Sequence, residues 1–370
     1  MADGMQKAVI SEPGVYLNLP DSDYFAVDAI GSSDIKKLLK NPADWWYESA
    51  HNPHYERSSD SAARTLGSAL HCLLLEGEQA YAERFAVEPD PKDYPNAART
   101  VKDLRELLNL FDIEFKATSN KPDLVEKFRA YNLHHRSWDL IVEEHRELVE
   151  GGMTPLTARQ DRCVRHMSEL ALAHEDIGPA IRGGLNEVSV FWRREGDDTL
   201  YRARFDCLQP GFNLDLKSMS NWQGRNVAQS VIKQITELEY DLQRVFYDEA
   251  RSALREHVQA GRIITGAGTT DENLTSLKQI ASRDEWKWVW LFYQVRDDRT
   301  GKAPILVPRL HEPTGTVYEE AQNAIELALE NYRDFRDRFS LDTPWHHSEP
   351  LEELEDHHLA NLQYKRSIST

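Results

Sequence analysis

Two aspartates and a lysine form a pattern that suits metal-assisted hydrolysis of a phosphodiester. Asp206 is followed nine residues later by the run Asp215-Leu216-Lys217. Such hydrolysis needs a cation, an activated water and an in-line geometry, and Mg²⁺ prefers carboxylate oxygens as ligands. Side chains two residues apart in a strand point to the same face, so Lys217 is expected beside Asp215, where its ammonium can orient the attacking water. The alternative is an ordinary solvated strand, because Asp-x-Lys triplets are common.

Strands are expected to carry these residues, because the flanking sequence alternates between apolar and polar residues. Residues 187–192 and 200–206 alternate in this way, residues 209–212 form a turn, and residues 213–217 continue as the next strand. A hairpin of this length would place Asp206, at the end of its strand, beside Asp215 at one edge of the sheet.

The remaining elements alternate between helices and strands. An aromatic-rich strand at 286–295 is expected to pair with residues 303–310. The hydrophobic period predicts helices at 32–39, 62–75, 157–181, 228–257 and 316–339. Because strands stand between helices, the sequence predicts an α/β fold with a mixed sheet.

Two stretches interrupt this order. Residues 101–131 read as two short helices around an extended link, which indicates a small self-contained insertion; its six basic and six acidic residues give no electrostatic support for a DNA contact. Residues 261–284 contain Gly266 and Gly268 and are expected to form a mobile loop.

Further polar side chains stand on the predicted elements. Glu187 begins the strand before Asp206 and can add an oxygen to a metal shell, or is simply a surface glutamate. His71 lies on the apolar helix at 62–75, where a hydrogen-bonded core histidine is the alternative to a ligand. Gln243 and Tyr247 share a helical face, and this pair can hold a substrate strand. Arg202 and Arg204 precede Asp206 on the same strand, and they face either DNA phosphates or a neighbouring carboxylate.

Composition limits the class of protein. A net charge of −18 argues against a protein that coats nucleic acid non-specifically, but not against basic residues confined to one channel. No apolar run reaches the roughly 20 residues of a membrane span, and the N-terminus lacks a signal-peptide core, so we expect a cytoplasmic protein without a membrane partner. The three cysteines are too few for a disulfide framework.

The order of these motifs resembles the PD-(D/E)xK nucleases, within them the RecB-type branch. The likeness is carried by the opening helix and by the histidine, acidic, Asp-x-Lys and Gln-x-x-x-Tyr motifs, which here are Ile30–Ile35, Leu66–Glu76, Arg204-Phe205-Asp206, Leu214–Ser218 and Gln243–Tyr247. It is closest to the RecE-type (exonuclease VIII) domain of phage recombination systems. The insertion resembles the helix-extended-helix modules called SAP or HeH.

The resemblance implies a restriction-endonuclease-like core and a division of the chain into an N-terminal helical part (1–97), the inserted module (98–132), the nuclease core (133–345) and an acidic tail (346–370). It implies that Mg²⁺, replaceable by Mn²⁺, is held by Asp206, Asp215 and the Leu216 carbonyl, with His71 and Glu187 completing the metal environment. Lys217 would act on the water. The residues assigned to DNA are Gln243, Tyr247, Ser33 and Lys36.

The function that the resemblance implies is a Mg²⁺-dependent exodeoxyribonuclease. It would degrade linear double-stranded DNA 5′→3′, leave 3′ single strands for recombination, form a ring-shaped homo-oligomer and hand its product to a single-strand annealing protein. Two alternatives remain: an endonuclease of the same fold in DNA processing or defence, and a non-catalytic DNA-binding scaffold. The presence of Asp206, Asp215 and Lys217 together argues against the scaffold.

Overall fold

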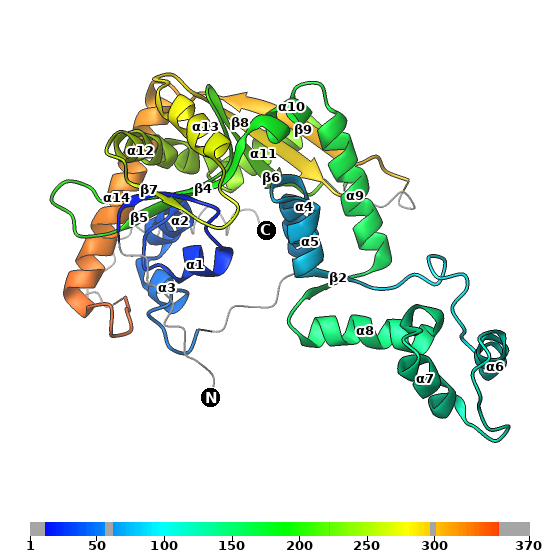
Figure 1. Cartoon of the computed structure of the whole chain (residues 1–370). Coiled ribbons are helices and arrows are strands. Elements are labelled where there is room, and N and C mark those ends of the chain that lie inside the picture. The colour runs from blue at the N-terminus through cyan, green and yellow to red at the C-terminus, as the bar shows by residue number, and fades with distance from the viewer. Residues whose placement is uncertain (1–11, 56–61, 222, 297–300, 348–370) are drawn as a thin grey trace, which may run out of the picture. The chain divides into compact units, whose positions relative to one another are not determined.

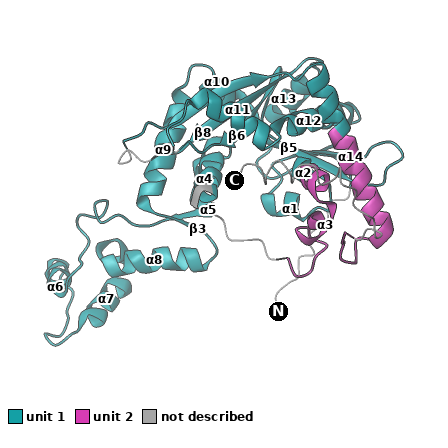
Figure 2. Cartoon of the chain, turned by 180° about the vertical axis from the view of Figure 1, so that it is seen from behind, with its two compact units in different colours: residues 1–33, 58–323 teal, residues 34–57, 324–370 magenta. Residues whose placement is uncertain are grey.

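The computed structural model describes residues 12–55, 62–221, 223–296 and 301–347 (Figure 1). The chain forms two compact units: residues 1–33 with 58–323, and residues 34–57 with 324–370 (Figure 2). Only the first two residues of the expected tail at 346–370 lie among the described residues. Among the helices described, none has the length and hydrophobicity of a membrane span.

Unit 1, which is residues 1–33 with 58–323, is built on a mixed sheet in the order β7-β1-β4-β5-β6-β8-β9. Its strands are β1 (Gly14–Leu17), β4 (Leu185–Trp192), β5 (Tyr201–Gln209), β6 (Phe212–Ser218), β7 (Ile263–Thr265), β8 (Lys287–Gln294) and β9 (Ile305–His311). The neighbours β1 and β7, and β6 and β8, are parallel, whereas the other pairs are antiparallel. The prediction of a mixed α/β sheet is therefore confirmed. Two short strands, β2 (Phe85–Val87) and β3 (Thr154–Leu156), pair separately.

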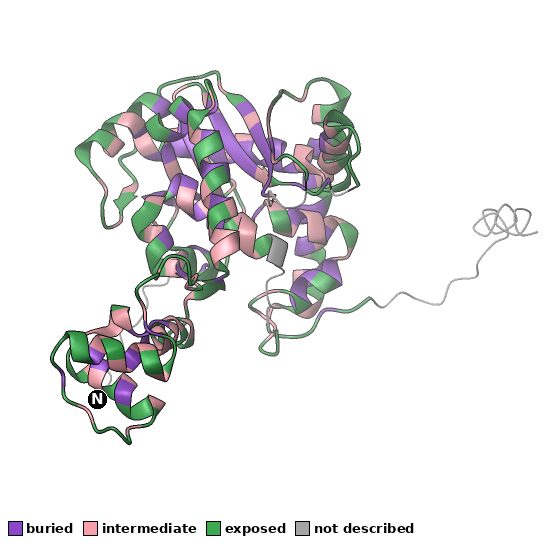
Figure 3. Cartoon of the chain, turned by 90° about the vertical axis from the view of Figure 1, so that its right-hand side faces the viewer, coloured by how far each residue is buried: buried purple, intermediate pink, exposed green. Residues whose placement is uncertain are grey.

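Helices of unit 1 flank its sheet, and the strands β4 and β8 are mostly buried (Figure 3). In chain order the helices are α1 (Asp21–Ala26), α2 (Ser32–Lys40), α3 (Pro42–Tyr47), α4 (Ala62–Leu75), α5 (Gly77–Arg84), α6 (Val101–Leu110), α7 (Lys121–Ala130), η1 (His134–Arg136, a 3₁₀ helix), α8 (Trp138–Glu150), α9 (Ala158–Ala173), α10 (Ile177–Gly183), α11 (Val227–Glu237), α12 (Tyr240–Gln259), α13 (Asp271–Ala281) and α14 (Thr316–Phe339).

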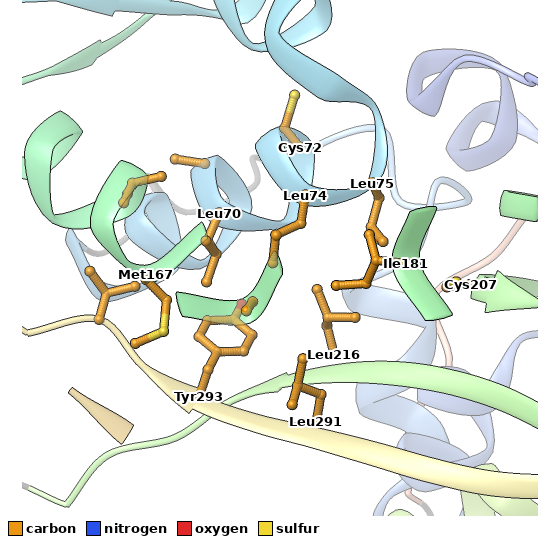
Figure 4. Packing of buried hydrophobic residues seen from close by; sticks show 14 of the residues in the cluster. Leu70, Cys72, Leu74, Leu75, Met167, Ile181, Cys207, Leu216, Leu291 and Tyr293 are labelled. Carbon is orange, nitrogen blue, oxygen red and sulfur yellow. The ribbon is translucent and has the colours of Figure 1, made fainter. Parts of the chain in front are cut away.

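Helix α4, which spans the residues 62–75 predicted from the hydrophobic period, packs its apolar side on the sheet. Leu70 and Leu74 point toward Leu216 of β6 and Leu291 of β8 (Figure 4). Helices α9 and α10 extend the same buried cluster with Met167 and Ile181, among others. Burial of these side chains stabilises α4 and fixes the orientation of the polar residues on its flank.

Helix α12 packs on the sheet through aromatic residues. The Tyr247 ring lies 5.1 Å from both Phe205 and Trp288, measured between ring centroids. The prediction of one helix at 228–257 is wrong: the chain breaks between α11 and α12, where Glu239 has a left-handed backbone with φ of 50°. In the segment 261–284, the glycine-containing residues 266–270 form a turn, but strand β7 and helix α13 flank them, so the segment as a whole is not a loop.

The insertion has a small apolar core of its own. Leu104 and Leu108 of α6 pack against Leu124 and Phe128 of α7, and Leu140 of α8 belongs to the same cluster. The helices α6 and α7 begin and end in the same way. Each begins with a capping box. Each is followed by a residue with positive φ, which is Asp112 after α6 and Asn132 after α7. The packing thus extends beyond residue 132 to include α8.

Unit 2, which is residues 34–57 with 324–370, is held together by aromatic side chains. The Trp45 ring centroid lies 5.2 Å from that of Tyr332 in α14 and 5.0 Å from that of Trp345. The Trp46 indole donates a hydrogen bond to the Leu341 carbonyl at 2.8 Å.

Candidate metal centre

Three carboxylates lie in one row across the middle of the sheet. The register of β4 with β5 sets Glu187 opposite Asp206, and that of β5 with β6 sets Asp206 opposite Asp215. Regular pairing is interrupted at this row, and Asp206 Oδ2 accepts a hydrogen bond from the Leu216 N–H at 2.7 Å. Asp206 therefore lies inside β5 rather than at its end, and the row lies on central strands rather than at an edge of the sheet.

The interruption has a backbone cause. Glu187 has φ of 55°, in the left-handed region that residues other than glycine rarely adopt. Such a conformation costs about 1–3 kcal/mol and persists where the surroundings enforce it, often at functional sites. No glycine or asparagine marks the position, so the sequence gives no sign of it.

Helix α4 brings His71 to this row. Its Nδ1 lies 3.5 Å from Glu187 Oε1, and its Nε2 lies 3.5 Å from Asp206 Oδ2. Potential ligand atoms of His71, Glu187 and Asp206 all lie within 4.8 Å of one another. The His71 side chain is the most open of the three, at 29% exposed, so the group is accessible from its side.

These three side chains fit a divalent cation. One imidazole nitrogen and two carboxylates form a donor set that Mn²⁺ and Mg²⁺ accept. The buried Glu187 Oε1 receives no hydrogen bond from any described residue. A buried acceptor in this condition is costly unless a proton or a cation occupies it.

The electrostatics of the group support the same conclusion. Burial raises the pKa of Glu187 to about 7, although His71 opposes the shift. Burial would lower the pKa of His71, but the Asp206 and Glu187 carboxylates raise it to about 9. The polypeptide alone therefore balances its crowded carboxylates with protons, and a bound cation would replace them.

Asp215, the remaining carboxylate of the row, forms an ion pair with Lys217. Lys217 Nζ lies 2.7 Å from Asp215 Oδ2, as expected from their two-residue spacing. Burial raises the pKa of Asp215 to about 6, although the Lys217 ammonium opposes this shift. The Lys217 ammonium also lies 4.9 Å from the centroid of the Tyr240 ring. Asp215 is thus outside the His71 group, and both its oxygens are engaged by protein.

Gln243 and Tyr247, which the sequence assigns to DNA, point into the protein. Gln243 donates from Nε2 to Asp215 Oδ1 at 3.1 Å, and both residues are buried. The buried Tyr247 hydroxyl donates to the Arg204 carbonyl at 2.9 Å. Their polar groups hold the strands that carry the acids, and a contact of either residue with DNA stays a prediction.

The other expected site residues are arranged as follows. Leu216 touches Asp206 through its N–H rather than through the carbonyl that the resemblance names as a ligand. Ser33 is exposed in the first turn of α2, and no contact among the described residues joins it to His71, Glu187 or Asp206. Lys36 belongs to unit 2, and its role at DNA stays a prediction.

Arg204, for which the sequence allows phosphates or carboxylates as partners, contacts carboxylates. Its guanidinium binds Asp21 and lies 3.4 Å from Glu187 Oε2. The alternation of Arg204 with Asp206 on one strand was the available signal; the partner, Asp21, lies 183 residues away.

A cavity of about 1060 Å³ begins at Ser218, the residue after Lys217, but neither Asp215 nor Lys217 lines it. Gly67 of α4, Ser218 at the end of β6 and Tyr293 of β8 line it near the site. Basic side chains also line it, namely Arg64, Arg225 and Lys233.

Residues 31–285 match the model of a family described as a PDDEXK-like domain of unknown function (DUF3799). No curated protein matches the chain.

Proposed function

This chain belongs to the PDDEXK-like family of unknown function (DUF3799), and from that premise we propose that it is a Mg²⁺-dependent exodeoxyribonuclease acting on linear double-stranded DNA. A PDDEXK-like domain suggests a nuclease, and nucleases of this type generally use divalent metals. One observation carries the proposal. The candidate metal ligands His71, Glu187 and Asp206 lie next to the ion pair of Asp215 and Lys217.

The residues of the site support distinct roles in hydrolysis. His71, Glu187 and Asp206 would hold Mg²⁺, or Mn²⁺ in its place, and such a cation stabilises the charge that develops on a phosphate. Lys217, held at Asp215, presents an ammonium that orients a water or steadies charge at phosphorus. Gln243 fixes the Asp215 carboxylate from its other oxygen.

The cavity that begins at Ser218 supports DNA as the substrate. Its volume of about 1060 Å³ is at the upper end of small-molecule sites, about 300–1,000 Å³, and a polymer strand needs such an extended space. Arg64, Arg225 and Lys233 supply positive charge along its walls. In a chain of net charge −18, basic residues gathered at one cavity fit a confined DNA channel rather than a broad DNA-binding surface.

The finer parts of the proposal rest on the order of the motifs, which is similar to that of RecE-type enzymes. From it we infer 5′→3′ degradation, 3′ single-stranded products for phage-type recombination, a ring-shaped homo-oligomer, a single-strand annealing partner and a cytoplasmic location. The inserted helices α6 to α8 are a candidate docking surface for such a partner or for DNA.

Digestion of matched DNA forms tests the proposal. The purified protein with Mg²⁺ should degrade linear duplex DNA and leave a closed circle of the same sequence intact. End-labelled substrates, with and without a 5′ phosphate, report the direction: early release of the 5′ label supports 5′→3′ degradation. Cleavage of the closed circle would favour the endonuclease, and binding of linear DNA without cleavage would favour the scaffold.

A further inference from the structure

We propose that Arg204 is a positioning residue that holds Glu187 in the orientation the metal centre requires. The inference rests on the proposed metal centre at His71, Glu187 and Asp206. It assigns to Arg204 a role that acts through another side chain, without contact with the metal or with DNA.

Glu187 needs support that the sheet does not give it. Its left-handed backbone, with φ of 55°, interrupts the ladder where Glu187 stands opposite Asp206. Oε1 lies 3.5 Å from His71 Nδ1 and has no hydrogen bond among the described residues. The direction of this carboxylate therefore depends on what holds its other oxygen.

Arg204 contacts that other oxygen. It lies on β5 two residues before Asp206 and pairs in register with Ser189 of β4, which stands two residues after Glu187. The guanidinium donates from Nε to Ser189 Oγ at 2.9 Å, and its Nη1 lies 3.4 Å from Glu187 Oε2. Glu187 is thus held between Arg204 on one side and His71 on the other.

The segment at residues 19–24 fixes the guanidinium in turn. Nη2 of Arg204 donates to the Leu19 carbonyl at 3.0 Å, and Nη1 binds the Asp21 carboxylate. The Tyr24 ring lies under the guanidinium, with its centroid 4.0 Å from Cζ. The side chain is only 10% exposed. With Nε, Nη1 and Nη2 all engaged, Arg204 is committed to the protein and does not reach for a phosphate.

Arg202 provides a matched control. It lies on the same face of β5, two residues before Arg204 and opposite Phe191 rather than Ser189. Its guanidinium donates to the carbonyls of Tyr24 and Val27 and lies 5.3 Å from the centroid of the Tyr24 ring. Substituting Arg202 therefore removes a neighbouring guanidinium while the hydrogen bonds that Arg204 makes with Ser189, Glu187, Asp21 and Leu19 are all retained.

A double-mutant cycle on Mn²⁺ affinity, measured by electron paramagnetic resonance of the free ion, tests the inference. Groups that orient a metal ligand typically change affinity 10- to 100-fold when removed, so we expect about that loss for Arg204→Gln. Arg204→Lys should lose less, because it keeps the charge without the forked geometry. In a Glu187→Gln background, Arg204→Gln should cause little further loss. Arg202→Gln should bind Mn²⁺ within about threefold of the wild type.

The outcomes separate this inference from the proposed function. If the wild type binds no Mn²⁺, the proposed metal centre fails, and the inference fails with it. If the wild type binds Mn²⁺ but Arg204→Gln binds it equally well, only the inference is overturned. It is also overturned if the losses from Arg204→Gln and Glu187→Gln add fully. If circular dichroism shows that Arg204→Gln is unfolded, the same cycle is read with Arg204→Lys.

Discussion

Gln243 offers the sharpest test of how the site works, because sequence and structure give it different roles. Its Nε2 donates to Asp215 Oδ1 at 3.1 Å, with both residues buried. We therefore expect Gln243→Leu, which keeps the volume and removes the donor, to impair catalysis rather than DNA binding. A hydrogen bond to a charged group is worth about 1.5–3 kcal/mol, which converts to a roughly 10- to 100-fold slower chemical step.

The assay separates chemistry from binding. Single-turnover cleavage with excess enzyme and Mg²⁺ reports the chemical step, while fluorescence anisotropy with labelled DNA and Ca²⁺ reports affinity. Gln259→Leu, at the exposed end of the same helix, is the matched control. If Gln243→Leu instead weakens DNA affinity tenfold and leaves the single-turnover rate unchanged, Gln243 holds DNA and the positioning role is refuted.

Four further predictions concern the same centre. Asp215→Ala and Lys217→Ala should each abolish cleavage of linear DNA while circular dichroism stays native; near-normal turnover by either variant would contradict the assignment of the pair. His71→Ala should weaken Mn²⁺ binding and change the melting temperature little, whereas a large fall in melting temperature with unchanged Mn²⁺ binding would mark a core histidine. Tyr247→Phe removes the hydrogen bond to the Arg204 carbonyl and should lower the free energy of unfolding by about 1 kcal/mol in a denaturant titration, and an unchanged midpoint would count against that contact. EDTA should stop DNA degradation and added Mn²⁺ should restore it; activity that persists in EDTA would exclude a metal centre.

Local patterns in the sequence predict some elements well and others not at all. The bounds of α4 and the β5–β6 hairpin follow from leucine spacing, alternation and the Pro210-Gly211 turn. The short strands β1 and β7 carry no period of their own. Strand β1 forms by pairing with β4 and β7, and β7 forms by pairing with β1, so each depends on partners far away in the chain. Likewise, neither glycine nor proline marks the break at Glu239, so the pattern suggests one long helix.

The site shows a similar limit. Residue types and motif order are enough to select His71, Glu187, Asp206, Asp215 and Lys217 as candidates. The two-residue spacing also predicts the contact of Lys217 with Asp215, but the sequence does not reveal which acids meet His71, because register and backbone at the row decide this. The partners of buried polar groups, such as Gln243, depend on tertiary packing, which spacing along one helix cannot specify.

The aromatic cluster of unit 2 has a consequence for the nascent chain. The bonds of Trp46 to Leu341 and of Asn331 to Leu38 join residues 295 and 293 positions apart. At a synthesis rate of about 5–20 residues per second, residues 34–57 wait roughly 15–60 s for their partners. Every strand of the sheet after β1, through β9, is made during that interval. Trp45 and Trp46 therefore lack their partners in residues 324–345 until the strands of the sheet have been translated.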